Sequence, residues 1–99
     1  MTIKFQDPVP LLVGVTGTGP GPAVGMMDRV AAVQATTAAG TATVAIEFSN
    51  DGTNWVSGIV AALSLNANSQ GAVVTAPFKY IRANVTANTG ATITASAGF

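Results

Sequence analysis

The stretch TATVAIEFSNDGTNW, residues 41–55, carries the pattern that decides the fold class of this chain. In its first half, larger apolar residues alternate with small or polar ones, which places Val44, Ile46 and Phe48 on one face of an extended strand. The Asp-Gly pair that follows supplies the positive φ values that a tight hairpin turn requires. The stretch therefore predicts a half-buried β-strand that ends in a tight turn.

The predicted turn contains Asp51 and Gly52, and it also offers oxygen atoms that a cation could bind. Asn50 and Asn54 add amide oxygens to the single carboxylate, whereas a calcium loop normally brings several carboxylates. We therefore predict that Asp51 and Gly52 form a structural turn, with a weak calcium site as the alternative. Trp55 is expected to begin the next strand and to cover the core, with an exposed platform for a sugar ring as its alternative.

A second strand with two different faces is predicted in FKYIRANV. Its apolar face carries an isoleucine and a valine, and Arg82 lies on the opposite face with Tyr80. A charge on a partly covered sheet needs a partner, and Glu47 or Asp51 is the natural candidate. We predict a structural ion pair of Arg82 with one of these carboxylates. The alternative is a ligand contact made by Trp55 and Tyr80.

From residue 26 onward, short β-type segments alternate with turn signals such as TAAG, NDGTN, NANSQG and ANTG. Segments at this spacing predict an all-β chain folded as an antiparallel β-sandwich, jelly-roll-like, with little or no helix. The segment 26–39 also comes near helical spacing, and we favour a strand there because the threonine-rich segment after it needs a pairing partner. The core is expected to be drawn from Val33, Val44, Ile46, Phe48, Ile81, Val85 and Ile93.

The first quarter of the chain differs in composition from the rest. Prolines at positions 8, 10, 20 and 22 lie among glycines, and LLVGV is the only strand-like piece between them. Proline removes backbone donors and fixes φ, whereas glycine prevents a regular element from persisting. We therefore predict an extended N-terminal arm over residues 1–25 and a β-sandwich domain over residues 26–99.

Composition excludes several classes of function. The 99 residues include no cysteine and no histidine, so a disulfide scaffold, a thiolate nucleophile and the commonest general base are absent. The four carboxylates are scattered, and we predict that the protein is not an enzyme and uses no cofactor or metal. The charged fraction is 8% and the net charge is zero, which predicts no nucleic-acid partner. No run of residues predicts a membrane span or a secretion signal.

The order of the segments VQAT, TATVAIEFSNDGTNW, PFKYIRANVT and GATIT resembles that of small virion proteins of tailed bacteriophages, of the head decoration or cement type. The resemblance implies a non-enzymatic protein that binds the outer capsid surface and stabilises the shell by bridging capsid subunits. It implies the major capsid protein and further copies of this chain as partners, with a trimer as the expected assembly. The expected location is the phage head surface, after synthesis in the cytoplasm of the bacterial host.

Two other functions follow from the same motifs. The segments around Trp55 and Arg82 are also similar to part of a discoidin-type domain, which implies binding of glycan or of a host surface through Trp55 and Tyr80. A tail or baseplate accessory protein of a phage is the other alternative, and it differs from a decoration protein only in its location.

Overall fold

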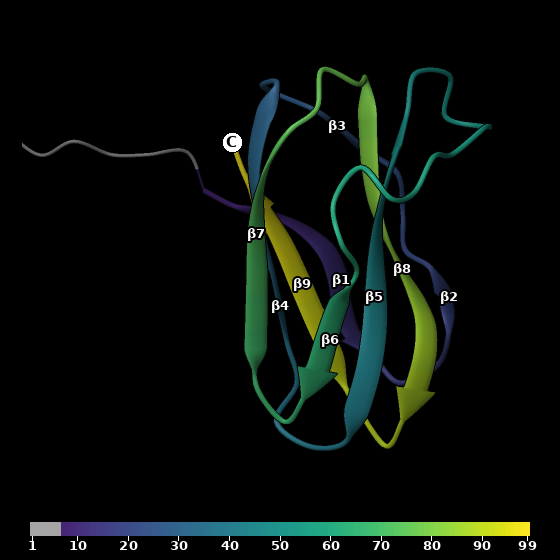
Figure 1. Ribbon diagram of the computed structural model, residues 1–99, viewed down its shortest axis with the longest axis vertical. Coiled ribbons are helices and arrows are strands. Elements are labelled where there is room, and N and C mark those ends of the chain that lie inside the picture. Colours follow the sequence, from purple (N-terminus) through teal and green to yellow (C-terminus); the bar gives the residue numbers. More distant parts are fainter. Residues whose placement is uncertain (1–6) are drawn as a thin grey trace, which may run out of the picture.

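The computed structural model describes residues 7–99, and these residues form nine strands and no helix (Figure 1). The prediction of an all-β chain folded as an antiparallel sandwich is therefore confirmed. No helix in this part of the chain is long and apolar enough to cross a membrane. The strands are β1 (Val9–Val15), β2 (Gly19–Pro20), β3 (Val24–Gly25), β4 (Val30–Thr36), β5 (Thr41–Ser49), β6 (Leu63–Asn66), β7 (Ser69–Thr75), β8 (Tyr80–Thr89) and β9 (Ile93–Gly98).

The strands form two sheets that pack face to face. One sheet has the order β1-β9-β4-β7, and the other has the order β2-β8-β5-β6, with β3 also paired to β8. Strands of the first half of the chain pair with strands of the second half in reverse order, namely β1 with β9, β2 with β8, β4 with β7 and β5 with β6. The chain is thus one long antiparallel hairpin that bends into two layers, which the pairs β4–β9 and β5–β8 complete.

The core lies between the two sheets and follows the alternation of each strand. In β5 and β8, the register sets Phe48 opposite Ile81 and Val44 opposite Val85, and all four side chains are buried. Every residue predicted for the core is at most 3% exposed, as found for Val33, Val44, Ile46, Phe48, Ile81, Val85 and Ile93. Phe78 begins the segment FKYIRANV, which was predicted as one strand, but it precedes β8 and stacks on Phe48 at the core with the ring centroids 5.6 Å apart.

The segment from residue 26 to residue 39 contains a strand rather than a helix. Within β4, Ala31, Val33 and Ala35 are buried while their neighbours Ala32 and Gln34 are exposed. This period of two matches a strand whose inner face contributes small side chains to a thin core. The preference for a strand is therefore confirmed.

The predicted arm is wrong for residues 9–25, and residues 1–6 lie outside the described part of the chain. Strand β1 pairs with β9, and its Leu11 and Leu12 are 1% and 2% exposed in the core. The glycine- and proline-rich residues that follow line the edge of the second sheet, where the Gly21 N–H donates to the Ala83 carbonyl at 2.7 Å. Proline and glycine shape an irregular sheet edge here, so the domain boundary at residue 25 does not hold.

The segment after the Asp-Gly turn also differs from the prediction, in which Trp55 begins the next strand. Only Val56 returns to pair with β5, through two hydrogen bonds with Phe48 at 2.9 and 3.0 Å. The chain then runs without strand structure until Leu63, where β6 begins. Trp55 therefore does not begin a strand, because Ser57 and Gly58, with φ of 83° at the glycine, interrupt the ladder directly after it.

Candidate functional site

The turn after β5 is held together by the side chains of Ser49 and Asp51. The Asp51 carboxylate accepts the backbone N–H groups of Thr53 and Asn54 at 2.9 and 2.8 Å, and the Asn54 side-chain amide at 2.8 Å. The buried Ser49 hydroxyl lies 2.9 Å from the same carboxylate and accepts the Gly52 N–H at 2.9 Å. The carboxylate oxygens are thus occupied by donors of the turn itself.

These hydrogen bonds hold the pKa of Asp51 well below its usual value, with the Asn54 side-chain amide as the largest cause, followed by the backbone N–H groups of Asn54 and Thr53. Gly52 has φ of 74°, a conformation that strains any residue with a β-carbon. Asp51 and Gly52 thus lie in a turn, as predicted, but only Gly52 has a positive φ, and the pairing of Phe48 with Val56 closes a loop over residues 49–55 instead of the tight hairpin that was expected. Within residues 7–99, no group of three or more His, Cys, Asp or Glu side chains is placed to hold a metal ion.

Glu47 and Arg82 form the predicted ion pair on the outer face of the sheet that contains β5 and β8. They are direct cross-strand partners, and Arg82 Nε donates to Glu47 Oε1 at 2.7 Å. Asn84 donates its side-chain amide to the second oxygen, Glu47 Oε2, at 3.1 Å. The side chains of Arg82 and Glu47 are 22% and 12% exposed, so the pair is partly covered. Asp51 is not the partner of Arg82, because its carboxylate is held in the turn.

Trp55 lies over this pair and not over the core, which corrects the prediction made for it. The Arg82 guanidinium carbon is 4.2 Å from the centroid of the Trp55 ring, a cation–π contact. The loop that Phe48 and Val56 close carries the ring across to the outer face of β8. One face of the Trp55 ring is therefore already covered by Arg82.

Tyr80 lies beside the turn. A β-carbon placed on Gly52 would be 3.6 Å from the Tyr80 ring, and the ammonium of Lys79 is 5.5 Å from the centroid of that ring. The ring thus supports the turn from the neighbouring strand. Within the described chain, no buried side-chain nitrogen or oxygen lacks a hydrogen-bond partner. The buried polar side-chain atoms of this face are therefore all hydrogen-bonded, as expected of a structural cluster.

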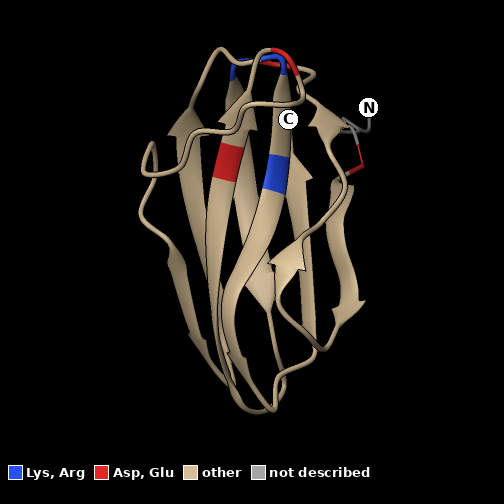
Figure 2. Cartoon of the chain, turned by 90° about the vertical axis from the view of Figure 1, so that its right-hand side faces the viewer, with Lys and Arg blue, Asp and Glu red and all other residues tan. Residues whose placement is uncertain are grey.

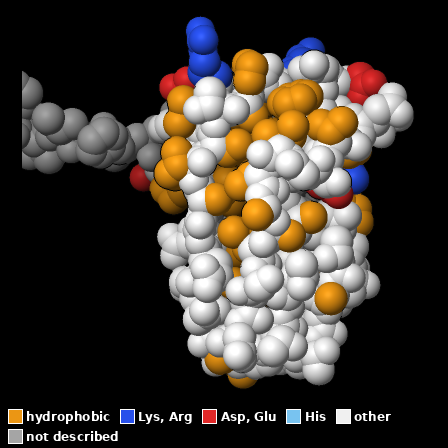
Figure 3. All heavy atoms as spheres, in the orientation of Figure 1, with side chains coloured by type: hydrophobic (Ala, Val, Ile, Leu, Met, Phe, Trp, Pro, Cys, Tyr) orange, Lys and Arg blue, Asp and Glu red, His pale blue; other side chains and the backbone are white. Residues whose placement is uncertain are grey.

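The other sheet has a different character, because none of its four strands contains a charged residue. Strands β1, β4, β7 and β9 read VPLLVGV, VAAVQAT, SQGAVVT and ITASAG. Figure 2 shows most of the charged residues gathered at one end of the sandwich. Glu47 and Arg82 lie apart from them as cross-strand partners on β5 and β8. Val30, Val56 and Ile59 are exposed apolar side chains. Hydrophobic side chains gather in the upper half of the face shown in Figure 3.

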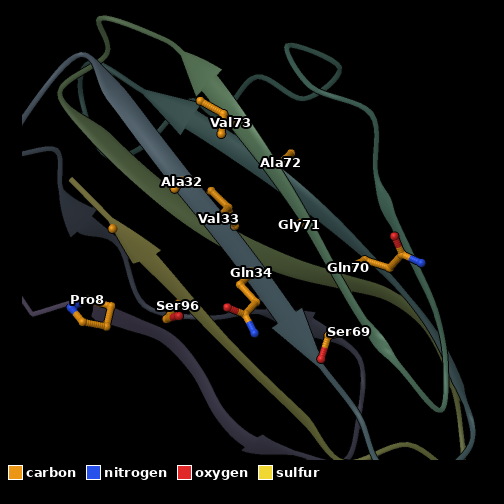
Figure 4. Close-up of a pocket in the computed structure, with 11 residues that line it drawn as sticks. Pro8, Ala32, Val33, Gln34, Ser69, Gln70, Gly71, Ala72, Val73 and Ser96 are labelled. Carbon is orange, nitrogen blue, oxygen red and sulfur yellow. The ribbon is translucent and has the colours of Figure 1, made fainter.

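The outer face of this uncharged sheet is hollowed into a shallow groove of about 640 Å³ (Figure 4). It runs across β9, β4 and β7, and the small residues that line it include Ala32, Gly71 and Ser96. The face was missed at the level of sequence, although the four segments share the absence of charged residues. Which strands share a sheet could not be read from that shared feature.

The structure thus presents two surfaces. One is the cluster around Arg82, which is held by an ion pair and a cation–π contact, and the other is an uncharged sheet with a shallow groove. The first brings together Glu47, Arg82 and Trp55, which the sequence had singled out. Comparison of the chain with protein-family models, with curated proteins and with solved structures finds no match.

Proposed function

We propose that this protein is a non-enzymatic structural protein of a phage virion, which binds the outer surface of the head and stabilises the shell by bridging capsid subunits. The observation that carries the proposal is the uncharged sheet β1-β9-β4-β7. Its outer face is the surface proposed to contact the major capsid protein.

A face of this composition is suited to burial against another protein. The centres of protein interfaces are depleted of charged residues, because a charge that loses its water must find a partner. Alanine and glycine also lose no side-chain entropy on burial, and they allow two backbones to approach closely. Ala32, Gly71 and Gly98 supply such positions along the groove. So few charges would be a disadvantage for a protein that diffuses freely, because surface charge keeps proteins soluble.

The pairing of the two halves of the chain in reverse order gives further support. Two four-stranded layers joined in this way, with β2 and β3 counted as pieces of one strand, have the connectivity that we infer to be a jelly roll. Jelly rolls occur in viral capsid and lectin domains. Fold alone does not decide function, so the proposal rests on the uncharged face and not on the connectivity.

The test compares two isosteric substitutions that each convert an amide into a carboxylate. Gln34→Glu places a charge on the uncharged face, and Asn66→Asp places one on β6 of the other sheet; both residues are exposed. We expect Gln34→Glu to bind undecorated phage heads at least tenfold more weakly than the wild type, and Asn66→Asp to bind normally. Equal binding by both variants would overturn the proposed face. Binding to isolated tails but not to heads would indicate that the protein belongs to the tail or baseplate.

The rival function, glycan binding through Trp55 and Tyr80, has less support. Arg82 covers one face of the Trp55 ring, and Tyr80 lies against the turn glycine. A sugar that stacked on Trp55 would use the remaining face only. Glycan binding by the wild type that is lost in Trp55→Ala would favour this rival over the capsid proposal.

A further inference from the structure

The edge strands of the two sheets, β1, β2, β3, β6 and β7, are not equally protected against pairing with another strand. Strand β1 carries Pro10 and two register shifts along its pairing with β9. Strands β2 and β3 have two residues each, and β6 has four. Short strands, prolines and bulges are the devices by which native sheet edges avoid association. Strand β7 has none of them, since its seven residues contain no charge and no proline and pair with β4 without a shift.

The hydrogen bonds at both ends of β7 show which of its backbone groups face β4. The carbonyl of Asn68 accepts the Thr37 N–H at 3.1 Å, and the N–H of Ala76 donates to the Arg29 carbonyl at 2.7 Å. Between these bonds the register is unbroken. Backbone groups in an antiparallel ladder alternate in direction from one residue to the next. The even-numbered residues therefore bond to β4, and the odd-numbered residues point to the free edge.

Four residues of β7 thus direct their backbone N–H and C=O groups away from the sheet. Among residues 7–99, no hydrogen-bond partner occurs on that side for Ser69, Gly71, Val73 and Thr75. Their side chains lie on the outer face, where Val73 is 75% exposed and Gly71 contributes to the groove beside Gln34 (Figure 4). The edge offers a complete row of unpaired groups together with an exposed valine.

We propose that a second copy of this chain pairs with this edge, β7 against β7, in an antiparallel two-fold contact centred on Ala72. In this register each of the four outward-pointing residues exchanges both hydrogen bonds with the other copy. Val73 of one copy then stands opposite Gly71 of the other, so the exposed valine covers the position that has no side chain. Ser69 stands opposite Thr75, two hydroxyl side chains that can bond to each other.

The distribution of charge favours the antiparallel arrangement. The end of β7 at Thr75 adjoins Arg29 and the charged end of the sandwich, whereas the end at Ser69 adjoins the uncharged turn that contains Asn68. An antiparallel pair sets the charged end of one copy beside the uncharged end of the other. Like charges are therefore kept apart, and the net charge of zero adds no repulsion.

The contact joins two uncharged sheets into one continuous sheet of the order β1-β9-β4-β7-β7-β4-β9-β1. A two-fold contact between identical edges closes on itself, so it forms a dimer. This replaces the trimer that the resemblance implied, and it does not depend on the proposed binding to phage heads.

The first experiment measures the mass of the full chain in solution over a wide range of concentration, by light scattering or sedimentation equilibrium. Val73→Lys places a charge at the proposed contact, and Val13→Lys places the same charge on β1; both valines are 75% exposed. We expect the wild type and Val13→Lys to be dimers and Val73→Lys to be monomeric with an unchanged melting temperature. A monomeric wild type, a trimer, or a dimer that Val73→Lys leaves intact would overturn the proposal.

The second experiment tests the β7–β7 register directly, and it remains informative even if Val73→Lys folds poorly. The chain contains no cysteine, so single-cysteine variants report one position each. Ala72→Cys brings two thiols together at the two-fold axis in a non-hydrogen-bonded pair, where β-carbons lie close enough for a disulfide. Val73→Cys faces Gly71 instead. We expect mild oxidation to convert Ala72→Cys to a covalent dimer at least tenfold faster than Val73→Cys or Val13→Cys. Equal rates would overturn the register, and faster linkage through Val13 would place the contact at β1.

Discussion

Glu47 and Arg82 face each other across β5 and β8, 35 residues apart in the chain, with Arg82 Nε 2.7 Å from Glu47 Oε1. The pair is neither fully buried nor free in solvent, because Trp55 covers the guanidinium while the side chains remain 22% and 12% exposed. Its contribution should therefore lie between that of an exposed ion pair and that of a buried one.

Arg82→Ala should lower the free energy of unfolding by about 2 kcal/mol, since Glu47 would keep only the amide of Asn84 as a partner. Glu47→Gln keeps the shape of the side chain and should cost less. Urea unfolding of the two variants measures the difference. A loss of less than about 0.5 kcal/mol in Arg82→Ala would show that the pair contributes no more than an exposed one.

Gly52→Val should destabilise the fold by about 1–3 kcal/mol, because a β-branched residue is strained at the φ of 74° found there. Contact is not the cause, since the added β-carbon would lie 3.6 Å from the Tyr80 ring. Gly17→Val is the matched control, as Gly17 has no positive φ and no atom within 4 Å of an added β-carbon. Equal melting temperatures for the two variants would contradict the strained turn.

The contribution of Asp51 to stability should depend on pH. Its pKa is lowered in the folded chain from the ordinary value of 3.8, so its ionised form stabilises the fold at every pH above about 4. As the pH falls below that value, the unfolded chain binds the proton first and the stabilisation is lost. The difference in melting temperature between the wild type and Asp51→Asn should thus be constant near neutrality and shrink in acid. A difference that stays the same down to pH 2 would exclude this role.

Leu11→Ala should cost about 2–5 kcal/mol, the range for truncating a buried leucine, because Leu11 is 1% exposed between the sheets. Val13→Ala, on the same strand and 75% exposed, should be close to neutral. Thermal or chemical unfolding separates the two. If residues 9–15 were an arm outside the sandwich, both variants would melt like the wild type.

Local features of the chain were predictable from the sequence. The inner face of β5, with Val44, Ile46 and Phe48, follows from the two-residue period of any extended strand. The turn that contains Gly52 follows from the few residues that tolerate positive φ. Both depend only on neighbouring residues, so no knowledge of the rest of the fold was needed. The scarcity of charge was equally plain from composition.

Contacts between distant segments were decided by the tertiary structure alone. The segment predicted as an arm forms an outer strand, in which Val9 pairs with Ala97. Its Leu11 and Leu12 can be buried only because β9 lies beside them. The cross-strand register made Glu47 the ion-pair partner of Arg82, whereas Asp51 accepts hydrogen bonds within its own turn. The uncharged sheet likewise exists only because four separate segments were brought together. Strand pairing depends on backbone hydrogen bonds and burial shared between segments far apart, and no local pattern carries that information.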